Sequence, residues 1–553
     1  MYTFIGRDKE LCTLQTAYES DRSELVVVYG RRRIGKTALL TQFCKDKAGV
    51  YFAAKRQDDA GQRQDFNETM KRAGAPVSRM LETLPNWEAG FRQLAALPGS
   101  GKKVMVLDEF PYMAEGNPTL PSLLQHLWDH ELQSANVMIV LCGSALSFME
   151  KEVLSEKSPL FGRATRTVKV DQMLFDDVRQ FFPQYDAADA VLAYSVLGGT
   201  PYALNCFDPN RSVEENIREQ LLSPSGRLWD YPTQLIAQEC REPGRFNDIL
   251  RTVATGSHRF SEIASKTVIQ SPNLPRYLRS LAEMGFVERS FPADQSFKEK
   301  ANSQRGLYDI ADNLVAFWYR YVWPNFSVLN MGGAELVWKH QVAPRLNEIA
   351  SFPFEEVCRQ YLEKLNLKEK LPFAASRIGR WWDKNEEVDI LAVPFEGRAR
   401  LFGECKFRQS EFARGDYVRL KKKAQAVPHE QAHYVLFSKS GFAPGLKLLA
   451  QDPNEHLTLV TLDEVADSVE KSFSCAGKII AASIFEPDQV VDAAVGNRLD
   501  AVQARVFVAV CLAAYNGAQT FEVHDLNVLL IDDDQVVVRE AAQNAAHRFE
   551  FEA

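Results

Sequence analysis

A glycine-rich loop between an apolar run and a helix-forming segment constrains this chain more than any other feature. The apolar run is residues 24–29, and residues 38–43 continue as a helix. Strand, loop and helix in this order are the context that the G-x-x-x-x-G-K-[ST] motif requires. The loop consists of Gly30, Arg31, Arg32, Arg33, Ile34, Gly35, Lys36 and Thr37.

The chemistry of this loop is that of a phosphate site. Converging backbone N–H groups and the positive end of the helix attract phosphates. The Lys36 ammonium would bind the β- and γ-phosphates, and the Thr37 hydroxyl would bind Mg²⁺. The sequence therefore predicts a site for ATP and Mg²⁺.

A second apolar run, residues 103–107, ends in Asp108 and Glu109. Buried parallel strands are continuous apolar runs, and ligands bind at their carboxyl ends. We expect Asp108 to hold Mg²⁺ through water and Glu109 to polarise the attacking water; the alternative is a helix N-cap followed by a first-turn acid. A third run, residues 136–142, leads to Ser144, which is either a sensor of the γ-phosphate or a capping serine.

Length and charge bound the architecture. A chain of 553 residues exceeds a single core, so several domains are expected. The net charge is −8, and residues 475–553 alone carry 12 acidic and five basic residues. The rest is close to neutral, which leaves nucleic-acid contact open. The chain opens without a signal-like segment, its uncharged stretches contain turn formers, and its nine cysteines form no C-x-x-C pair. We therefore expect a cytoplasmic protein without membrane contact.

Several further segments resemble the archaeal-type ATPases, which are related to the AAA+ and STAND classes of P-loop proteins. These segments are residues 4–11 (FIGRDKEL), 107–109 (LDE), 141–144 (LCGS), 160–163 (LFGR) and 198–202 (GGTPY). The resemblance implies that the first segment, with Phe4, Gly6 and Arg7, contacts the adenine. It also implies that Arg163 acts as an arginine finger and that residues 198–202 open a lid helix. From the residues alone, Arg163 is equally a surface arginine in a loop.

From residue 245 the pattern changes to short elements. Apolar spacing predicts helices around 249–253, 260–264 and 274–281, followed by strands at 286–289 and 306–310. Three helices and a hairpin make a winged helix. Its exposed charges are mixed: Arg276, Arg279, Glu283, Lys298, Lys300 and Arg305. We expect a lever between domains, with sequence-specific DNA binding as the alternative. In the resembling family an aromatic signature follows, matched here by residues 308–313 and 317–321, and we expect it to form a core seam.

Two strand-like runs, residues 387–393 and 401–407, flank Glu396 and Gly397. A two-residue turn there would place Asp389 opposite Glu404, and Glu387 opposite Lys406. Facing carboxylates repel each other, and a bound cation relieves the repulsion. Mg²⁺ on Asp389 and Glu404, with Lys406 near the attacking water or the phosphate, is an arrangement suited to phosphodiester cleavage.

This is the PD-(D/E)xK pattern of restriction-endonuclease-like folds, and the resembling family carries a C-terminal domain with this look. By resemblance, Glu355 is a further acid from the first helix of that fold. A predicted basic helix would meet a phosphate backbone through Arg414, Arg419, Lys421, Lys422 and Lys423. An inactive relative of the fold and an unrelated hairpin remain as alternatives.

The sequence thus predicts an α/β protein of five parts: a P-loop ATPase core with a parallel sheet (1–170), a helical lid (171–240), a winged helix (241–325), a nuclease-like α/β domain (326–470) and a small acidic α+β extension (475–553). The expected function is an ATPase whose nucleotide state controls the later modules on DNA or RNA. The alternative is a STAND-like signalling ATPase whose C-terminal domain binds a protein partner. A homo-oligomer is compatible with both.

Overall fold

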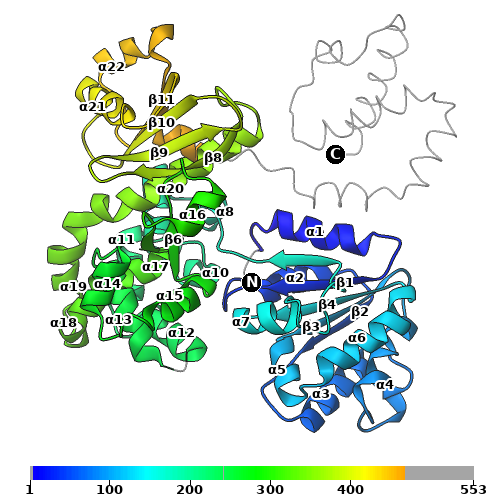
Figure 1. The fold of residues 1–553 in the computed structure, drawn as a ribbon. Helices are drawn as coiled ribbons and strands as arrows, with labels where there is room; N and C mark the ends of the chain where they lie inside the picture. Colours follow the sequence, from blue (N-terminus) through cyan, green and yellow to red (C-terminus); the bar gives the residue numbers. More distant parts are fainter. Residues whose placement is uncertain (1–3, 241, 468–553) are drawn as a thin grey trace, which may run out of the picture. The chain divides into compact units, whose positions relative to one another are not determined.

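A five-stranded parallel sheet organises the N-terminal part of the chain in the computed structural model (Figure 1). Its strands run in the order β2-β3-β4-β1-β5. Their bounds are β1 Glu24–Tyr29, β2 Gly49–Ala53, β3 Lys103–Asp108, β4 Val137–Gly143 and β5 Arg166–Lys169. Strand β4, which corresponds to the third apolar run of the sequence, lies between β1 and β3, the strands that carry the two motifs. The structure describes residues 4–240 and 242–467, so the predicted extension at 475–553 lies outside the described residues.

Helices cover both faces of this sheet, as continuous apolar strands require (Figure 1). On one face, α1 (Asp8–Tyr18) and α2 (Lys36–Cys44) pack against Val26 and Val28. On the other face, the alternate residues Leu25 and Val27 belong to a second apolar cluster. The helices on that side are α3 Asp59–Arg72, α4 Trp87–Phe91, α5 Phe110–Gly116 and α6 Leu120–His130. The three central strands β3, β4 and β1 are therefore buried from both sides.

A group of short helices follows in the region for which the sequence predicted a lid. They are α8 Phe175–Phe181, α9 Ala187–Leu197, α10 Pro201–Leu204, α11 Val213–Gln220 and α12 Tyr231–Glu239. Helix α9 contacts α8 and α11 and also two later helices, α17 (Asn313–Phe317) and α20 (Leu346–Leu367). Because α9 is buried over nearly its whole length, it forms the centre of the largest apolar cluster.

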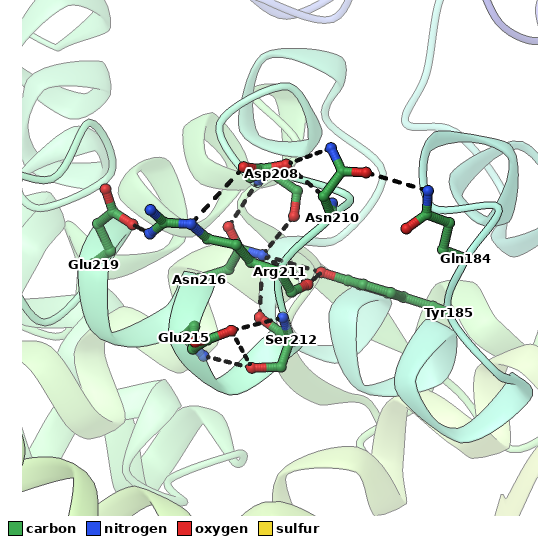
Figure 2. A network of polar contacts seen from close by, with 9 residues as sticks. All are labelled: Gln184, Tyr185, Asp208, Asn210, Arg211, Ser212, Glu215, Asn216 and Glu219. Atoms are coloured by element: carbon green, nitrogen blue, oxygen red, sulfur yellow. Dashed lines mark hydrogen bonds and ion pairs between the residues drawn. The ribbon is translucent and has the colours of Figure 1, made fainter.

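Polar contacts fix the start of α11 (Figure 2). The Ser212 hydroxyl accepts a hydrogen bond from the Glu215 N–H (3.2 Å), and the Ser212 N–H donates to the Glu215 carboxylate (3.0 Å). This reciprocal pair is a capping box. The Asn216 amide donates to the Asp208 carbonyl (2.8 Å) and to the Tyr185 hydroxyl (3.0 Å). The network therefore ties the turn before α11 to the preceding part of the lid.

Three helices and a hairpin occupy the middle of the chain, in the predicted order. They are α13 Pro243–Ala254, α14 Phe260–Lys266, α15 Leu274–Glu283, and the antiparallel strands β6 Val287–Ser290 and β7 Leu307–Ile310. The predicted basic loop between the strands contains a short helix, α16 (Phe297–Asn302). Six residues are too few to show apolar periodicity, but Ser296 and Glu299 form a capping box that marks its start.

The aromatic signature lies in the core, as predicted. Phe317, Trp318 and Tyr319 are almost completely buried. The Trp318 indole donates a hydrogen bond to the Trp229 carbonyl (2.6 Å). These rings join the lid to the helices that follow, α18 (Phe326–Asn330) and α19 (Ala334–Val337).

A second five-stranded sheet, of order β12-β11-β10-β9-β8, forms the C-terminal part of the described chain. Strands β8, β9 and β10 are antiparallel neighbours, whereas β10, β11 and β12 are parallel. Their bounds are β8 Ala375–Trp382, β9 Glu387–Pro394, β10 Ala399–Lys406, β11 Gln431–Ser438 and β12 Leu457–Thr461. Helices α20 and α23 (Leu462–Asp467) pack on one face, and α21 (Arg414–Ala424) and α22 (Pro444–Leu449) pack on the other. In the described part of the chain, no helix combines the length and apolarity needed to cross a membrane.

We predict that Ser212→Ala destabilises α11 locally, because the Glu215 N–H loses its acceptor. Loss of such a cap costs about 1 kcal/mol, which corresponds to roughly fivefold faster hydrogen exchange of the α11 amides. Ser225→Ala, at an exposed serine outside the network, is the matched control. Equal exchange rates in the two variants would contradict the assigned role of the capping box.

Candidate functional site

The phosphate-loop motif connects β1 to α2 and has the predicted strand–loop–helix context. A side chain at Gly30 would place its Cβ 2.3 Å from the Val170 carbonyl oxygen, and Gly35 has a φ of +96°. Both positions therefore require glycine. The Lys36 ammonium is buried and donates hydrogen bonds to the carbonyls of Gly30 (2.7 Å) and Arg31 (3.0 Å). The lysine thus lies across the loop.

Burial lowers the pKa of Lys36, while nearby groups, including the carboxylates of Asp108 and Glu109, act in the opposite direction. A buried cation whose direct partners are carbonyl oxygens is incompletely compensated. A phosphate placed in the loop would supply the missing negative charge.

The two residues predicted to share Mg²⁺ are in contact. The Thr37 hydroxyl donates a hydrogen bond of 3.0 Å to the buried Asp108 carboxylate. The hydroxyl of Tyr51, from the neighbouring strand β2, donates to the same oxygen (2.6 Å). Burial and the Asp108 carboxylate raise the pKa of Tyr51, so the phenol remains a donor. No sequence pattern indicated Tyr51, because its position depends on β2 pairing with β3.

Glu109 and Ser144 also meet. The Ser144 hydroxyl donates to the Glu109 carboxylate (2.9 Å), and the Ser144 N–H lies 3.3 Å from the same oxygen. Glu109 has a left-handed backbone, with a φ of +53°, and its side chain makes no capping hydrogen bond to α5. The N-cap of the helix after β4 is Ala145. The capping alternatives for Glu109 and Ser144 therefore do not describe this structure.

The N-terminal segment lies against the loop. The Arg7 guanidinium donates to the Ile34 carbonyl (2.9 Å), and Phe4 packs on the apolar cluster that contains Ile34. Gly6 has a φ of +66°, and a Cβ there would lie 2.7 Å from the Asp177 carboxylate. Burial raises the pKa of Asp177 to about 6, with Arg7 acting in the opposite direction. The structure thus brings Phe4, Gly6 and Arg7 to the loop.

The side chains of the three consecutive loop arginines contact residues outside the loop. Arg31 contacts the N-cap of α17, whereas Arg32 and Arg33 both contact α12. Arg31 pairs with Asp312 at 2.5 Å, Arg32 with Glu239 at 2.9 Å, and Arg33 lies over the rings of Tyr202 and Tyr231 at 4.2 and 5.0 Å. The prediction placed these arginines among the nucleotide ligands. Their side chains bind protein instead, which leaves their backbone for a phosphate.

Arg163 forms an ion pair with Asp129 of α6. Its Nε and a terminal nitrogen lie 3.0 and 2.8 Å from that carboxylate, and about a third of its side chain is exposed. In this chain, Arg163 is a paired surface arginine. Its role as an arginine finger remains a prediction.

The second candidate site lies on β9 and β10. The pairs Leu401–Ala392, Phe402–Leu391 and Gly403–Ile390 confirm the predicted register. Continuing this register places Asp389 opposite Glu404. The Asp389 carboxylate accepts a hydrogen bond of 2.8 Å from the Cys405 N–H.

Two lysines bind Glu404, which is only 6% exposed. The Lys406 ammonium lies 2.6 Å from one carboxylate oxygen, and the Lys423 ammonium lies 2.9 Å from the other. Burial opposes the charge on Lys406, but Glu404 outweighs it and raises the pKa of that lysine. The same register continues to Glu387 opposite Lys406, but their ion-pair partners differ: Glu387 pairs with Arg380 at 2.5 Å and Lys406 pairs with Glu404.

The predicted basic helix α21 is only partly available for a phosphate backbone. Lys423 binds Glu404, Lys421 binds Glu455 at 2.9 Å, and Arg419 binds Asp416. Lys423 was predicted as a surface contact, and the structure corrects this because α21 packs on β10. Arg414 and Lys422 remain exposed.

Glu355, on α20, lies near Asp389 and Glu404. The family resemblance implied that this acid belongs with them. Burial and the charge of Asp389 raise its pKa, with Arg380 acting in the opposite direction. Burial and Glu404 likewise raise the pKa of Asp389. The buried Oε2 atom of Glu355 has no hydrogen-bond partner among the described residues. Glu355 and Asp389 are therefore two neighbouring buried carboxylates whose ionisation a nearby positive charge would favour.

Carboxylates alone do not complete a metal site here. Among the residues that the structure describes, no group of three or more His, Cys, Asp or Glu side chains could hold a metal ion. Mg²⁺ often uses one or two protein carboxylates together with water and substrate phosphates. Asp389 and Glu404 fit this mode, with the substrate supplying the remaining oxygens.

Two family models match the chain. An ATPase domain found predominantly in Archaea matches residues 4–207. A domain of archaeal and bacterial proteins of unknown function matches residues 318–419. Among curated proteins, an uncharacterised protein of Methanocaldococcus jannaschii is 32% identical over 421 residues, which cover 73% of this chain and 88% of that protein.

Solved structures with a similar fold include the Walker-type ATPase PABY2304 of Pyrococcus abyssi. It is 21% identical, with a TM-score of 0.41, and the match covers 57% of this chain and 96% of that chain. Another is the ORC2 protein of Aeropyrum pernix, at 15% identity and a TM-score of 0.34, covering 60% of this chain and 94% of that chain.

We predict that Lys36→Ala abolishes measurable nucleotide binding, because the buried ammonium is the loop's main positive charge. Charge-assisted hydrogen bonds contribute about 1.5–3 kcal/mol each, so affinity should fall at least tenfold. Titration with a fluorescent ATP analogue and Mg²⁺ measures this. Lys45→Ala, at the exposed end of the same helix, should bind as the unmodified protein does. Retained affinity in Lys36→Ala would refute the assignment.

Proposed function

The chain belongs to the family of archaeal-type ATPases that join this ATPase domain to the C-terminal domain at residues 318–419, and from this premise we propose that it hydrolyses ATP to control a nuclease-like domain acting on DNA or RNA. One observation carries the ATPase part. Thr37, Asp108, Glu109 and Ser144 converge beside Lys36 at the carboxyl ends of three neighbouring strands.

In the proposed ATPase site, the loop amides and Lys36 bind the phosphates. Thr37 and Asp108 would hold Mg²⁺, which, when bound, offsets the charge that develops on the phosphate oxygens. Glu109 accepts a proton from the attacking water or orients it. Ser144 holds the Glu109 carboxylate, so it both positions the base and lies where the γ-phosphate ends.

The proposed second module is a PD-(D/E)xK nuclease-like domain. The element order α20, β8, β9, β10, α21, β11 and the confirmed β9–β10 register support it. Asp389 and Glu404 would hold Mg²⁺, which supplies charge stabilisation for phosphodiester cleavage. Lys406 would face the water or the phosphate, and Glu355 would contribute the further carboxylate.

We also propose that the three helices and hairpin at 243–310 are a winged helix that acts as a lever. The Arg305 guanidinium binds the Trp382 carbonyl, and the Trp382 indole donates back to the Arg305 carbonyl (3.1 Å). The wing is therefore attached to β8 of the second sheet. Exposed Arg276 and Arg279 on α15 remain available for a nucleic-acid phosphate.

One observation favours the alternative of an inactive, partner-binding domain. Lys406 and Lys423 already neutralise Glu404 at 2.6 and 2.9 Å. Two ammonium groups supply the charge that a divalent cation would otherwise bring. A STAND-like signalling ATPase would need only this stable, metal-free arrangement.

Glu109→Gln should bind ATP but hydrolyse it slowly. The amide keeps the shape of the side chain and its contact with Ser144, yet it cannot accept a proton. General-base catalysis contributes about 10²–10⁴-fold, so the turnover number should fall at least a hundredfold while nucleotide affinity stays within a few-fold. Phosphate release and analogue binding are measured on the same preparation. Normal turnover would remove Glu109 from the mechanism.

Cleavage assays separate the nuclease from the binding module. With Mg²⁺ or Mn²⁺, the unmodified protein should cut plasmid or single-stranded substrates, and Asp389→Ala and Lys406→Ala should each lose at least a hundredfold of this activity. Glu396→Ala, at the exposed hairpin tip, is the control. If no substrate is cut in any nucleotide state and all variants bind a partner equally, the C-terminal domain is a binding module.

A further inference from the structure

The short segment from Asp309 to Asp312 lies between the two candidate sites. Asp309 is in β7, and Asp312 is the N-cap of α17. Both side chains are buried and both form ion pairs, one toward the phosphate loop and the other toward the carboxylate cluster. Two buried acids so close in the chain, with partners in different domains, are a structural connection that the sequence did not predict.

Asp312 binds the phosphate loop through Arg31. The carboxylate and guanidinium are 2.5 Å apart, and their side chains are 2% and 7% exposed. Asp312 also accepts hydrogen bonds from the Gln172 amide (3.0 Å) and from the Val315 N–H (3.1 Å). The same carboxylate therefore holds the first residue after Gly30 and the first turn of α17.

The contacts of Arg31 would change when the loop binds a ligand. Its carbonyl accepts a hydrogen bond from the Lys36 ammonium, and its guanidinium also donates to the Thr200 hydroxyl at 3.1 Å. Its Nε and a second terminal nitrogen are buried without a hydrogen-bond partner in the described chain. Because unsatisfied buried donors are costly, this guanidinium gains from any rearrangement that satisfies them. A phosphate that draws Lys36 away from the Arg31 carbonyl would change the backbone that carries this side chain.

Asp309 binds the other end of the connection. Its carboxylate lies 2.8 Å from the His258 ring and 3.6 Å from the Arg380 guanidinium. The same guanidinium lies 2.5 Å from Glu387 and 3.9 Å from the buried carboxylate of Glu355. Arg380 is thus shared between the wing strand and an acid of the proposed nuclease-like site.

A cavity of about 370 Å³ gives this contact room to change. Asp309, Arg380, Glu387 and His258 line it, together with the Phe352 ring on which the Arg380 guanidinium lies at 4.8 Å. Close-packed interiors resist displacement of side chains. At the edge of a cavity, Arg380 can move between its acidic partners without disturbing the core.

We propose that Asp309 and Asp312 are positioning residues that join the two sites: Asp312 follows the loop through Arg31, and Asp309 passes the shift to Arg380, which holds Glu355. This rests on the proposed control of the C-terminal domain by nucleotide, and it names the residues that transmit that control. The segment moves as a unit because β7 is paired with β6 and Asp312 caps α17. Ligand occupancy can shift such an equilibrium only through contacts that differ between the two states.

Hydrogen exchange of the full chain, with and without a non-hydrolysable ATP analogue and Mg²⁺, tests the proposal. In the unmodified protein, we expect the analogue to change exchange in peptides that cover residues 352–359 and 387–392. Asp309→Asn should lose this change while still binding the analogue, and Asp312→Asn, which removes the counter-charge of Arg31, should lose it as well. Asparagine caps a helix as well as aspartate does, so Asp312→Asn keeps α17 while losing the charge. Asp312→Glu, which restores the carboxylate, should recover the response.

Asp416→Asn is the matched control, because Asp416 is also a buried aspartate that binds an arginine and the N-terminus of a helix. It should keep the nucleotide-dependent change. If the Asp309 and Asp312 variants bind the analogue and keep the change as well, the connection proposed here is wrong although nucleotide control stands. If the unmodified protein binds the analogue without any change at these peptides, nucleotide control itself fails. If it binds no analogue, the ATPase assignment fails first.

Discussion

Burying the Arg31 guanidinium beside a phosphate loop depends on the opposite charge that Asp312 supplies. An unpaired charge at that depth would cost several kcal/mol, so the loop conformation and the position of α17 are mutually dependent. Arg31 lies within the family model at residues 4–207, whereas Asp312 lies between that model and the one that begins at residue 318. The ATPase core is therefore completed by a residue from a later module. Arg32 likewise pairs with Glu239, which lies after the ATPase family model, whereas Tyr202, which Arg33 contacts, lies within it. A nucleotide in this loop would contact a backbone that three downstream elements already hold.

Much of this structure could be predicted from the sequence, because the residues concerned are close to one another in the chain. The phosphate loop is recognisable because strand, glycines, lysine and helix lie within a few residues of one another. The register of β9 and β10 is also local, because only residues 395–398 connect the two strands, and Gly397 among them has a positive φ. The buried aromatic signature follows from composition. In each case, the information lies in neighbouring residues, and tertiary packing did not override it.

Contacts between elements that are distant in the sequence could not be predicted. Tyr51 reaches Asp108 only because β2 is paired with β3, and Lys423 reaches Glu404 only because α21 packs on β10. A run of basic residues on a helix gives no sign of which one turns inward. The hairpin predicted that Glu387 lies opposite Lys406, but it could not predict that β8 brings Arg380 to Glu387 as its ion-pair partner. The short helix α16 was missed for a different reason. Its capping residues can be recognised in the sequence, but six residues are too few to show helical periodicity.

The two lysines that bind Glu404 are relevant to both interpretations of the C-terminal domain, as a nuclease and as an inactive binding domain. In water-poor surroundings, a lone buried carboxylate is unstable, so a site that awaits a cation needs a substitute charge until it arrives. Lys406 and Lys423 fill that role, and Lys406 retains a raised pKa there. A cation that displaces one ammonium leaves a charged lysine beside the metal, where a phosphate would bind. The ion pairs are thus compatible with an active site at rest. Glu355 favours an active site at rest, because its Oε2 atom is buried without a hydrogen bond among the described residues. A domain that only bound partners would gain stability by losing this acid, whereas the proposed metal site would use it as a further carboxylate.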